Sequence, residues 1–234
     1  MVFIWSKKMH PHKKALDYSL EIYDDNGLVD FSKYPVPPPI IIYDEAGNQV
    51  DTTLMEYPEQ CISNLYIHSD DTVLELGARY GSVSCIINKK LSSKGRQVSV
   101  EPDETVWKCL DANIARNNCL IHVHKGFVSK TSHELIQYGY GSTSHKSESS
   151  RIPSTSVEGL EELYGIKFTA LVADCEGFLE TFFEEHPNMY AQLTKVIFEA
   201  DSPKTCDYDT IRMNLKKHRF TEVIRGFQNV YVKS

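Results

Sequence analysis

The stretch Val73-Leu-Glu-Leu-Gly77-Ala-Arg-Tyr-Gly81-Ser-Val-Ser84 decides the fold of this chain of 234 residues. It contains an apolar strand, a glycine turn and the start of a helix, and Glu101 follows directly after the next predicted strand, 97–100. Glu101 lies 24 residues beyond Gly77, close to the roughly 20 expected between a nucleotide-binding turn and the acid that holds the ribose. The pattern therefore predicts a nucleotide-type cofactor site rather than a turn that serves packing alone.

The glycine spacing indicates which nucleotide the turn would bind. Arg79 stands where a dinucleotide-binding turn has its second glycine, which lets the backbone approach a pyrophosphate. S-adenosylmethionine has no pyrophosphate, and an acid within the strand, such as Glu75, would suit its sulfonium and ammonium groups. The carboxylate of Glu101 would accept hydrogen bonds from the two ribose hydroxyls. We therefore expect S-adenosylmethionine as the cofactor.

The composition limits the classes of partner that the chain can bind. The chain has 32 acidic and 25 basic residues and a formal net charge of -7, which argues against nucleic acid, because nucleic-acid binding relies on phosphate neutralisation. No apolar run approaches the length of a membrane span, so we expect no membrane partner. The six cysteines lack paired zinc spacing and lie mostly in apolar segments, as is typical of reduced thiols. We expect a cytoplasmic protein and leave its oligomeric state open, with a homodimer among the alternatives.

The chain divides into an extension and one domain. Residues 1–50 form an N-terminal extension with a proline-rich stretch at 34–39 and a predicted hairpin around 44–48. Residues 51–234 form the main domain, in which strands and helices alternate from Thr72 onward, as in a parallel sheet covered on both faces. The Gly- and Ser-rich segment 138–156 is predicted to be a loop, either disordered or a functional lid.

The C-terminal segments indicate which of two kinds of α/β sheet the chain forms. Residues 220–225 and 229–232 alternate polar and apolar side chains around Gly226, with no helix between them. Five strand–helix steps followed by such a hairpin are typical of a methyltransferase-type sheet rather than a dehydrogenase-type one. We therefore predict an α/β fold with a mostly parallel sheet, helices on both faces and a C-terminal antiparallel β-hairpin.

Several motifs together resemble the FkbM family of class I S-adenosylmethionine-dependent methyltransferases, over roughly residues 50–234. They are the glycine motif at 75–84, Val100-Glu-Pro102, the helix at 107–118, Ala173-Asp-Cys-Glu-Gly177 and Ile197-Phe-Glu-Ala-Asp201. The resemblance implies a Rossmann-like fold with a seven-stranded sheet, and methyl transfer to a hydroxyl, commonly on a sugar or polyketide-type scaffold. The chain departs from the family pattern at Val172, Leu179 and Asp201, where the family usually has lysine, glutamate and histidine.

The predicted site residues follow the strand ends and the turns. For the cofactor they are Glu75, Gly77, Ala78, Arg79, Gly81, Ser84, Glu101, Pro102, Phe127, Val128 and Asp174. For catalysis they are Asp174, Glu176 and Asp201, because the carboxyl ends of the fourth and fifth strands open onto the ligand crevice. Asp174 is the best candidate for the base, and Glu176 either takes that role or anchors a substrate hydroxyl. We expect no metal, because no histidine or amide lies at an obvious third-ligand spacing from Asp174 and Asp201.

These observations favour an O-methyltransferase that acts on a hydroxyl of a sugar, glycan or similar small polyol, with a small-molecule or glycan acceptor as its partner. Two alternatives stay open. One is a methyltransferase that acts on a protein or a nucleic acid, against which the acidic charge stands. The other is a non-catalytic S-adenosylmethionine-binding or scaffold protein of the same fold, which the departures at Val172 and Leu179 would suit.

Overall fold

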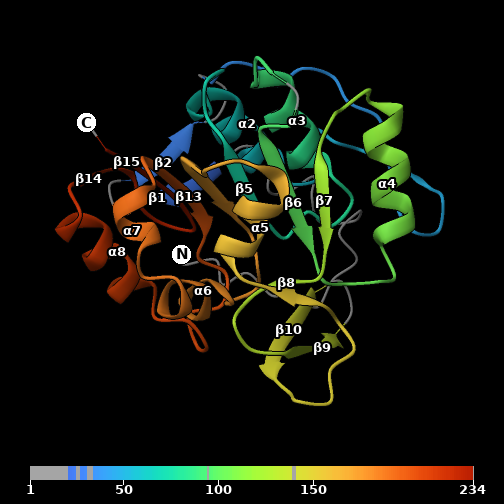
Figure 1. The fold of residues 1–234 in the computed structure, drawn as a ribbon. Helices are drawn as coiled ribbons and strands as arrows, with labels where there is room; N and C mark the ends of the chain where they lie inside the picture. The colour runs from blue at the N-terminus through green and yellow to red at the C-terminus, as the bar shows by residue number, and fades with distance from the viewer. Residues whose placement is uncertain (1–20, 25–26, 31–33, 94, 139–140, 234) are drawn as a thin grey trace.

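A seven-stranded sheet lies at the centre of the molecule (Figure 1). The computed structural model describes residues 21–24, 27–30, 34–93, 95–138 and 141–233. The sheet order is β14-β15-β13-β12-β5-β6-β7, in which β15 is antiparallel to both of its neighbours and the other pairs are parallel. The strands are β5 (Val73–Leu76), β6 (Gln97–Glu101), β7 (His122–Lys125), β12 (Ala170–Ala173), β13 (Lys195–Glu199), β14 (Phe220–Ile224) and β15 (Gln228–Lys233). The predicted mostly parallel sheet with a C-terminal antiparallel hairpin is confirmed.

Helices cover both faces of this sheet, which explains why its central strands are apolar throughout. Val73 and Leu74 of β5 point to opposite faces, and both are fully buried. Val73 packs in a cluster with residues of α2 and α3, whereas Leu74 packs with residues of α5, α6 and α8. The helices are α2 (Tyr57–Tyr66), α3 (Ser82–Lys90), α4 (Trp107–Arg116), α5 (Val157–Tyr164), α6 (Leu179–Glu185), α7 (Met189–Gln192) and α8 (Tyr208–Lys217).

The segment predicted as a loop, 138–156, is partly a strand. β10 (Gly141–Lys146) pairs antiparallel with β9 (His133–Tyr138), and β11 (Ser154–Thr155) pairs in parallel with β8 (Phe127–Val128). The loop prediction is wrong for these residues. A polar composition shows that a segment buries little apolar surface, but it does not prevent the backbone from pairing with a neighbouring strand.

The described part of the N-terminal extension forms two hairpins. β1 (Glu21–Asp24) pairs with β2 (Gly27–Asp30), and β3 (Ile42–Tyr43) pairs with β4 (Gln49–Val50), so the hairpin predicted around 44–48 is confirmed. Asn113 of α4 binds the backbone of β3 through both ends of its amide: Oδ1 accepts from the N–H of Tyr43 at 3.0 Å, and Nδ2 donates to its carbonyl at 2.8 Å. The second hairpin is thereby fixed to the main domain. Residues 1–20 lie outside the described residues.

None of the helices in the described ranges has the length and apolar content that a membrane-spanning segment requires. The six cysteines are free thiols, and four of them are buried. The buried thiols pack as small apolar groups, as Cys61 does between α2 and the sheet.

Candidate cofactor and acceptor site

The candidate site is a cleft at the carboxyl ends of β5, β6 and β12. The strand order reverses between β5 and β12, because β6 and β7 lie on one side of β5 and β12 and β13 lie on the other. In open α/β sheets such a switch point leaves a crevice where ligands bind. The predicted site residues that line this cleft are Gly77, Arg79, Glu101, Pro102, Phe127, Val128, Asp174 and Glu176.

Two glycines of the motif meet different structural requirements. Gly77 has a φ of +90°, and a Cβ there would lie 1.7 Å from the carbonyl oxygen of Asp174, so only glycine fits. Gly81 precedes α3 with a φ of +85°, and a Cβ there would lie 2.9 Å from Cδ1 of Leu110. Gly77 therefore brings the turn after β5 against the end of β12, whereas Gly81 lets α4 pack closely on α3.

Backbone N–H groups on both sides hold the carboxylate of Glu101. Its Oε2 accepts from the N–H of Arg79 and its Oε1 from the N–H of Asp103, each at 2.7 Å. Its side chain is buried, and burial raises the pKa of Glu101 to about 7, although the two N–H groups favour the ionised form. A carboxylate has about four acceptor positions, so Glu101 can accept further hydrogen bonds within the cleft that it lines.

Apolar side chains also line the cleft. The rings of Phe127 and Phe178 lie 5.4 Å apart, and Leu135 of β9 joins them as a lining residue. Residues 141–144 of β10 also line the cleft, so the β9–β10 hairpin forms one of its walls. The sequence interpretation missed Leu135 and Phe178. The signal that was available for Leu135 was an isolated apolar pair, Leu135-Ile136, in an otherwise polar segment.

Only two of the three acids predicted for catalysis line the cleft. Asp174 and Glu176 both line the cleft, in the turn that follows β12. The N–H of Asp174 donates to the carbonyl of Leu76 at 3.0 Å, which fixes the start of this turn on β5. Asp201 follows β13 and does not line the cleft, and its Oδ1 accepts from the hydroxyl of Tyr208 at 2.9 Å. The geometry therefore separates Asp201 from the other two acids.

Glu75, Ala78 and Ser84 lie behind the cleft rather than in its wall. Glu75 is 2% exposed, and its Oε2 accepts from the hydroxyls of Ser84 and Ser99 and from the amide of Gln97. Burial raises the pKa of Glu75 to about 7. Ala78 is buried, and its N–H donates to the carbonyl of Val100. These residues shape the turn and its electrostatic surroundings instead of facing the cleft.

Comparison with solved structures establishes the fold. The chain is similar to the precorrin-6y C5,15-methyltransferase from Geobacter metallireducens, with 12% identity, a TM-score of 0.50, and coverage of 85% of this chain and 97% of that one. This is the Rossmann-like fold of the class I methyltransferases. An rRNA methylase from Streptococcus thermophilus is also similar, with 8% identity, a TM-score of 0.48 and coverage of 76% and 95%. So is an O-methyltransferase from Bacillus cereus in complex with SAH, with 17% identity, a TM-score of 0.44 and coverage of 75% and 79%.

No family model matches the sequence. No curated protein matches it either. The resemblance to the FkbM family therefore stays a prediction.

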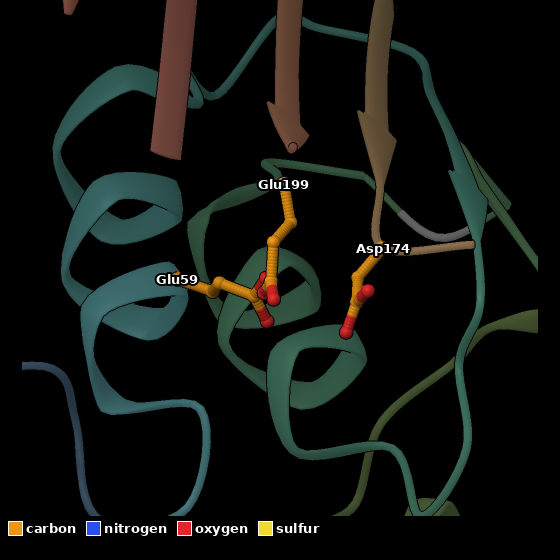
Figure 2. A group of neighbouring side chains, drawn as sticks. All are labelled: Glu59, Asp174 and Glu199. Atoms are coloured by element: carbon orange, nitrogen blue, oxygen red, sulfur yellow. The ribbon is translucent and has the colours of Figure 1, made fainter. Parts of the chain in front are cut away.

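A second cavity adjoins the cleft on the side of β13, and several acidic side chains line it. The two share Glu56 and Asp174 as lining residues. The carboxyl groups of Glu59 from α2, Asp174 from the turn after β12 and Glu199 from β13 lie close together there (Figure 2). The sequence interpretation missed Glu56 and Glu59, because no local pattern indicates that α2 lies beside the ends of β12 and β13.

Proposed function

We propose that this chain is an S-adenosylmethionine-dependent methyltransferase that methylates a hydroxyl of a sugar, glycan or similar small polyol. One observation carries the proposal: Glu101, held by two backbone N–H groups, and Asp174, fixed at the end of β12, line the same cleft at the switch point of the sheet. The carboxylate of Glu101 would bind the ribose of the cofactor, and the carboxylate of Asp174 would take the proton of the acceptor.

The described residues fit S-adenosylmethionine part by part. The carboxylate of Glu101 would accept hydrogen bonds from the ribose hydroxyls. The wall of Phe127, Phe178 and Leu135 offers an apolar surface for adenine. The turn at Gly77 presents backbone to the remaining, cationic part, and the buried acid Glu75 behind the turn adds negative potential there. When bound, the cofactor supplies an electrophilic methyl group on a sulfonium.

The residues of the chain would then align the acceptor and take its proton. Alignment alone can contribute about 7 to 11 kcal/mol when the reacting atoms are well oriented. A positioned base adds roughly 10² to 10⁴ in rate. Asp174 suits this role because its backbone is fixed on both sides, by the hydrogen bond to Leu76 and by the close approach of Gly77. Glu176, in the same turn, would accept a hydrogen bond from a second hydroxyl of the acceptor.

A polyol acceptor agrees with the polar groups around the cleft. Besides the two acids, Ser142, Thr143 and Ser144 of β10 line it, and their side chains can donate to or accept from hydroxyl groups. The formal net charge of -7 disfavours a polyanionic acceptor.

Two measurements test this proposal. Saturating S-adenosylmethionine should raise the thermal unfolding temperature of the full chain, and the absence of any shift would remove the cofactor assignment. Incubation with isotopically labelled cofactor and a panel of sugars and nucleotide sugars should give a labelled, methylated sugar by mass spectrometry. Label that appears only on added protein or RNA would overturn the acceptor class and keep the cofactor.

A further inference from the structure

We propose that the acidic cavity beside the cleft binds one hard divalent cation through the carboxylates of Glu59, Asp174 and Glu199. One ligand oxygen from each residue lies within 4.8 Å of the other two. The three residues come from α2, the turn after β12 and β13, and Figure 2 shows their carboxyl groups near one another below the ends of the strands. The proposal goes beyond methyl transfer, since binding of the ion requires neither cofactor nor acceptor.

The dimensions of the cavity suit a single ion. Two oxygens on opposite sides of an ion lie about 4.2 Å apart around Mg²⁺ and about 5 Å apart around Ca²⁺. One oxygen each of Glu59, Asp174 and Glu199 lies within 4.8 Å of the other two, which is close enough for one ion to contact all three. The cavity has a volume of about 10 Å³, which is about the space that one water molecule or one ion needs.

Glu75 supplies an independent indication of a ligand. It lines the same cavity and is 2% exposed. Its Oε2 is occupied by Ser84, Ser99 and Gln97, none of which lines the cavity, whereas its Oε1 has no hydrogen-bond partner among the described residues. Buried oxygens of this kind almost always have a partner. A water molecule on a bound cation would donate the missing hydrogen bond to Glu75.

The charge of the cavity also favours a cation. Four acids surround it: Glu59 and Glu75 are buried, and Glu56 and Glu199 are half-buried. Such carboxylates remain ionised in a buried site only when a positive charge compensates them. A divalent ion would supply that charge.

Gln228 positions two of the proposed ligands. Its Nε2 donates to Oε1 of Glu59 at 3.1 Å and to Oε2 of Glu199 at 3.2 Å. This amide holds one oxygen of each carboxylate, as residues behind metal ligands commonly do. The expectation of no metal arose because the third ligand was sought near Asp174 and Asp201 in the sequence, whereas Glu59 comes from α2.

Mn²⁺ binding to the cofactor-free full chain tests the proposal. Titration followed by the electron paramagnetic resonance signal of free Mn²⁺ should show one ion bound per chain, and Mg²⁺ should compete for it. Glu59→Gln keeps the shape of the side chain but removes one charged ligand, so we expect Mn²⁺ binding at least tenfold weaker. Glu184→Gln, at an exposed position of α6, is the control and should bind Mn²⁺ like the parent.

Two results would overturn the proposal. One is a parent protein that takes up no Mn²⁺ at millimolar concentration. The other is unchanged binding in both Glu59→Gln and Glu199→Gln, which would place the ion elsewhere. No S-adenosylmethionine is present in this experiment. The Mn²⁺ titration can therefore be interpreted even if the proposed methyl transfer fails.

Discussion

Gly77 packs against Asp174 so closely that a Cβ at position 77 would lie 1.7 Å from the carbonyl oxygen of Asp174. The contact crosses the point where the strand order reverses between β5 and β12. The N–H of Asp174 also donates to the carbonyl of Leu76 at 3.0 Å. The glycine turn and the turn that carries Asp174 therefore form one rigid unit, and the position of one fixes the position of the other.

Replacing Gly77 by alanine should destabilise the protein severely. The added carbon would overlap the backbone of Asp174, and the position has a φ of +90°. We expect a loss of at least about 2 kcal/mol, because overpacking and left-handed strain each cost about 1 to 3 kcal/mol. In a chain of this size, each kcal/mol lowers the unfolding temperature by about 2 to 4 °C, which calorimetry can measure.

Gly47 provides the matched control for this substitution. Its φ is +84°, and a Cβ there would meet nothing within 4 Å. Gly47→Ala should therefore show only the backbone strain, about 1 kcal/mol. Equal losses in the two variants would contradict the importance of the Gly77–Asp174 contact.

The sequence was sufficient to predict the sheet and to indicate two residues, Gly77 and Glu101, that line its cleft. A parallel strand buried on both faces must be apolar throughout, as 73–76 is, and the turn chemistry of Gly77 is local. Glu101 was also predictable from the local sequence, because the predicted strand, if of ordinary length, must end near it. Both Gly77 and Glu101 line the cleft.

The acidic cavity was not predictable, because it depends on packing between distant elements. Glu59 meets Glu199 only because α2 lies against the strand ends. Ser84 was predicted to touch the cofactor, yet its hydroxyl binds Glu75 at 2.6 Å, a contact between a helix and a strand that no local pattern specifies. The β9–β10 hairpin was missed because its composition carries no signal of pairing.

A buried ion pair should dominate the electrostatic part of the stability. Nζ of Lys195 at the start of β13 lies 2.5 Å from Oδ2 of Asp71, and the two side chains are 5% and 9% exposed. Lys195→Met would leave Asp71 buried and uncompensated, so we expect a loss of about 3 to 5 kcal/mol in the free energy of unfolding by urea. Adding Asp71→Asn should restore part of this loss.

The exposed pair of Lys125 and Asp111 is the control for that prediction. Its atoms lie 2.6 Å apart, but the side chains are largely in solvent. Lys125→Met should therefore change the stability by less than about 1 kcal/mol. A similar loss at both lysines would contradict the claim that burial of the charge determines the effect.

Asp174→Asn should separate catalysis from cofactor binding. Asparagine keeps the shape and the backbone contacts of Asp174 but cannot accept a proton at neutral pH. We expect kcat to fall by about 10² to 10⁴, with the Kd for S-adenosylmethionine changed only a few-fold. Asp201→Asn tests the alternative, since Asp201 binds Tyr208 and does not line the cleft. A larger loss of kcat in that variant would assign the base to Asp201.

Glu101→Gln should weaken cofactor binding. The carboxylate accepts from the N–H groups of Arg79 and Asp103 with different oxygens, and glutamine has only one oxygen to offer. Loss of a charged acceptor for the ribose is worth about 1.5 to 3 kcal/mol, so we expect a Kd about 10- to 100-fold higher by isothermal titration calorimetry. Glu104→Gln, at an exposed neighbouring position, should leave the Kd unchanged.

The pKa of Glu101 predicts a pH dependence of cofactor affinity. Burial raises this pKa from 4.5 to about 7 in the free protein, so Glu101 stabilises the fold fully below pH 4.5 and loses this contribution as the pH rises through about 7. The pH dependence of cofactor affinity has the opposite sign, because the ionised carboxylate is the form that accepts hydrogen bonds from the ribose hydroxyls. Affinity should therefore rise about tenfold from about pH 6 to about pH 8, with release of a proton on binding. Glu101→Gln should remove this part of the dependence, and since both proteins bind the same ligand, the ligand's own titration cancels in the comparison. Parallel pH profiles for the two proteins would show that Glu101 does not titrate on binding.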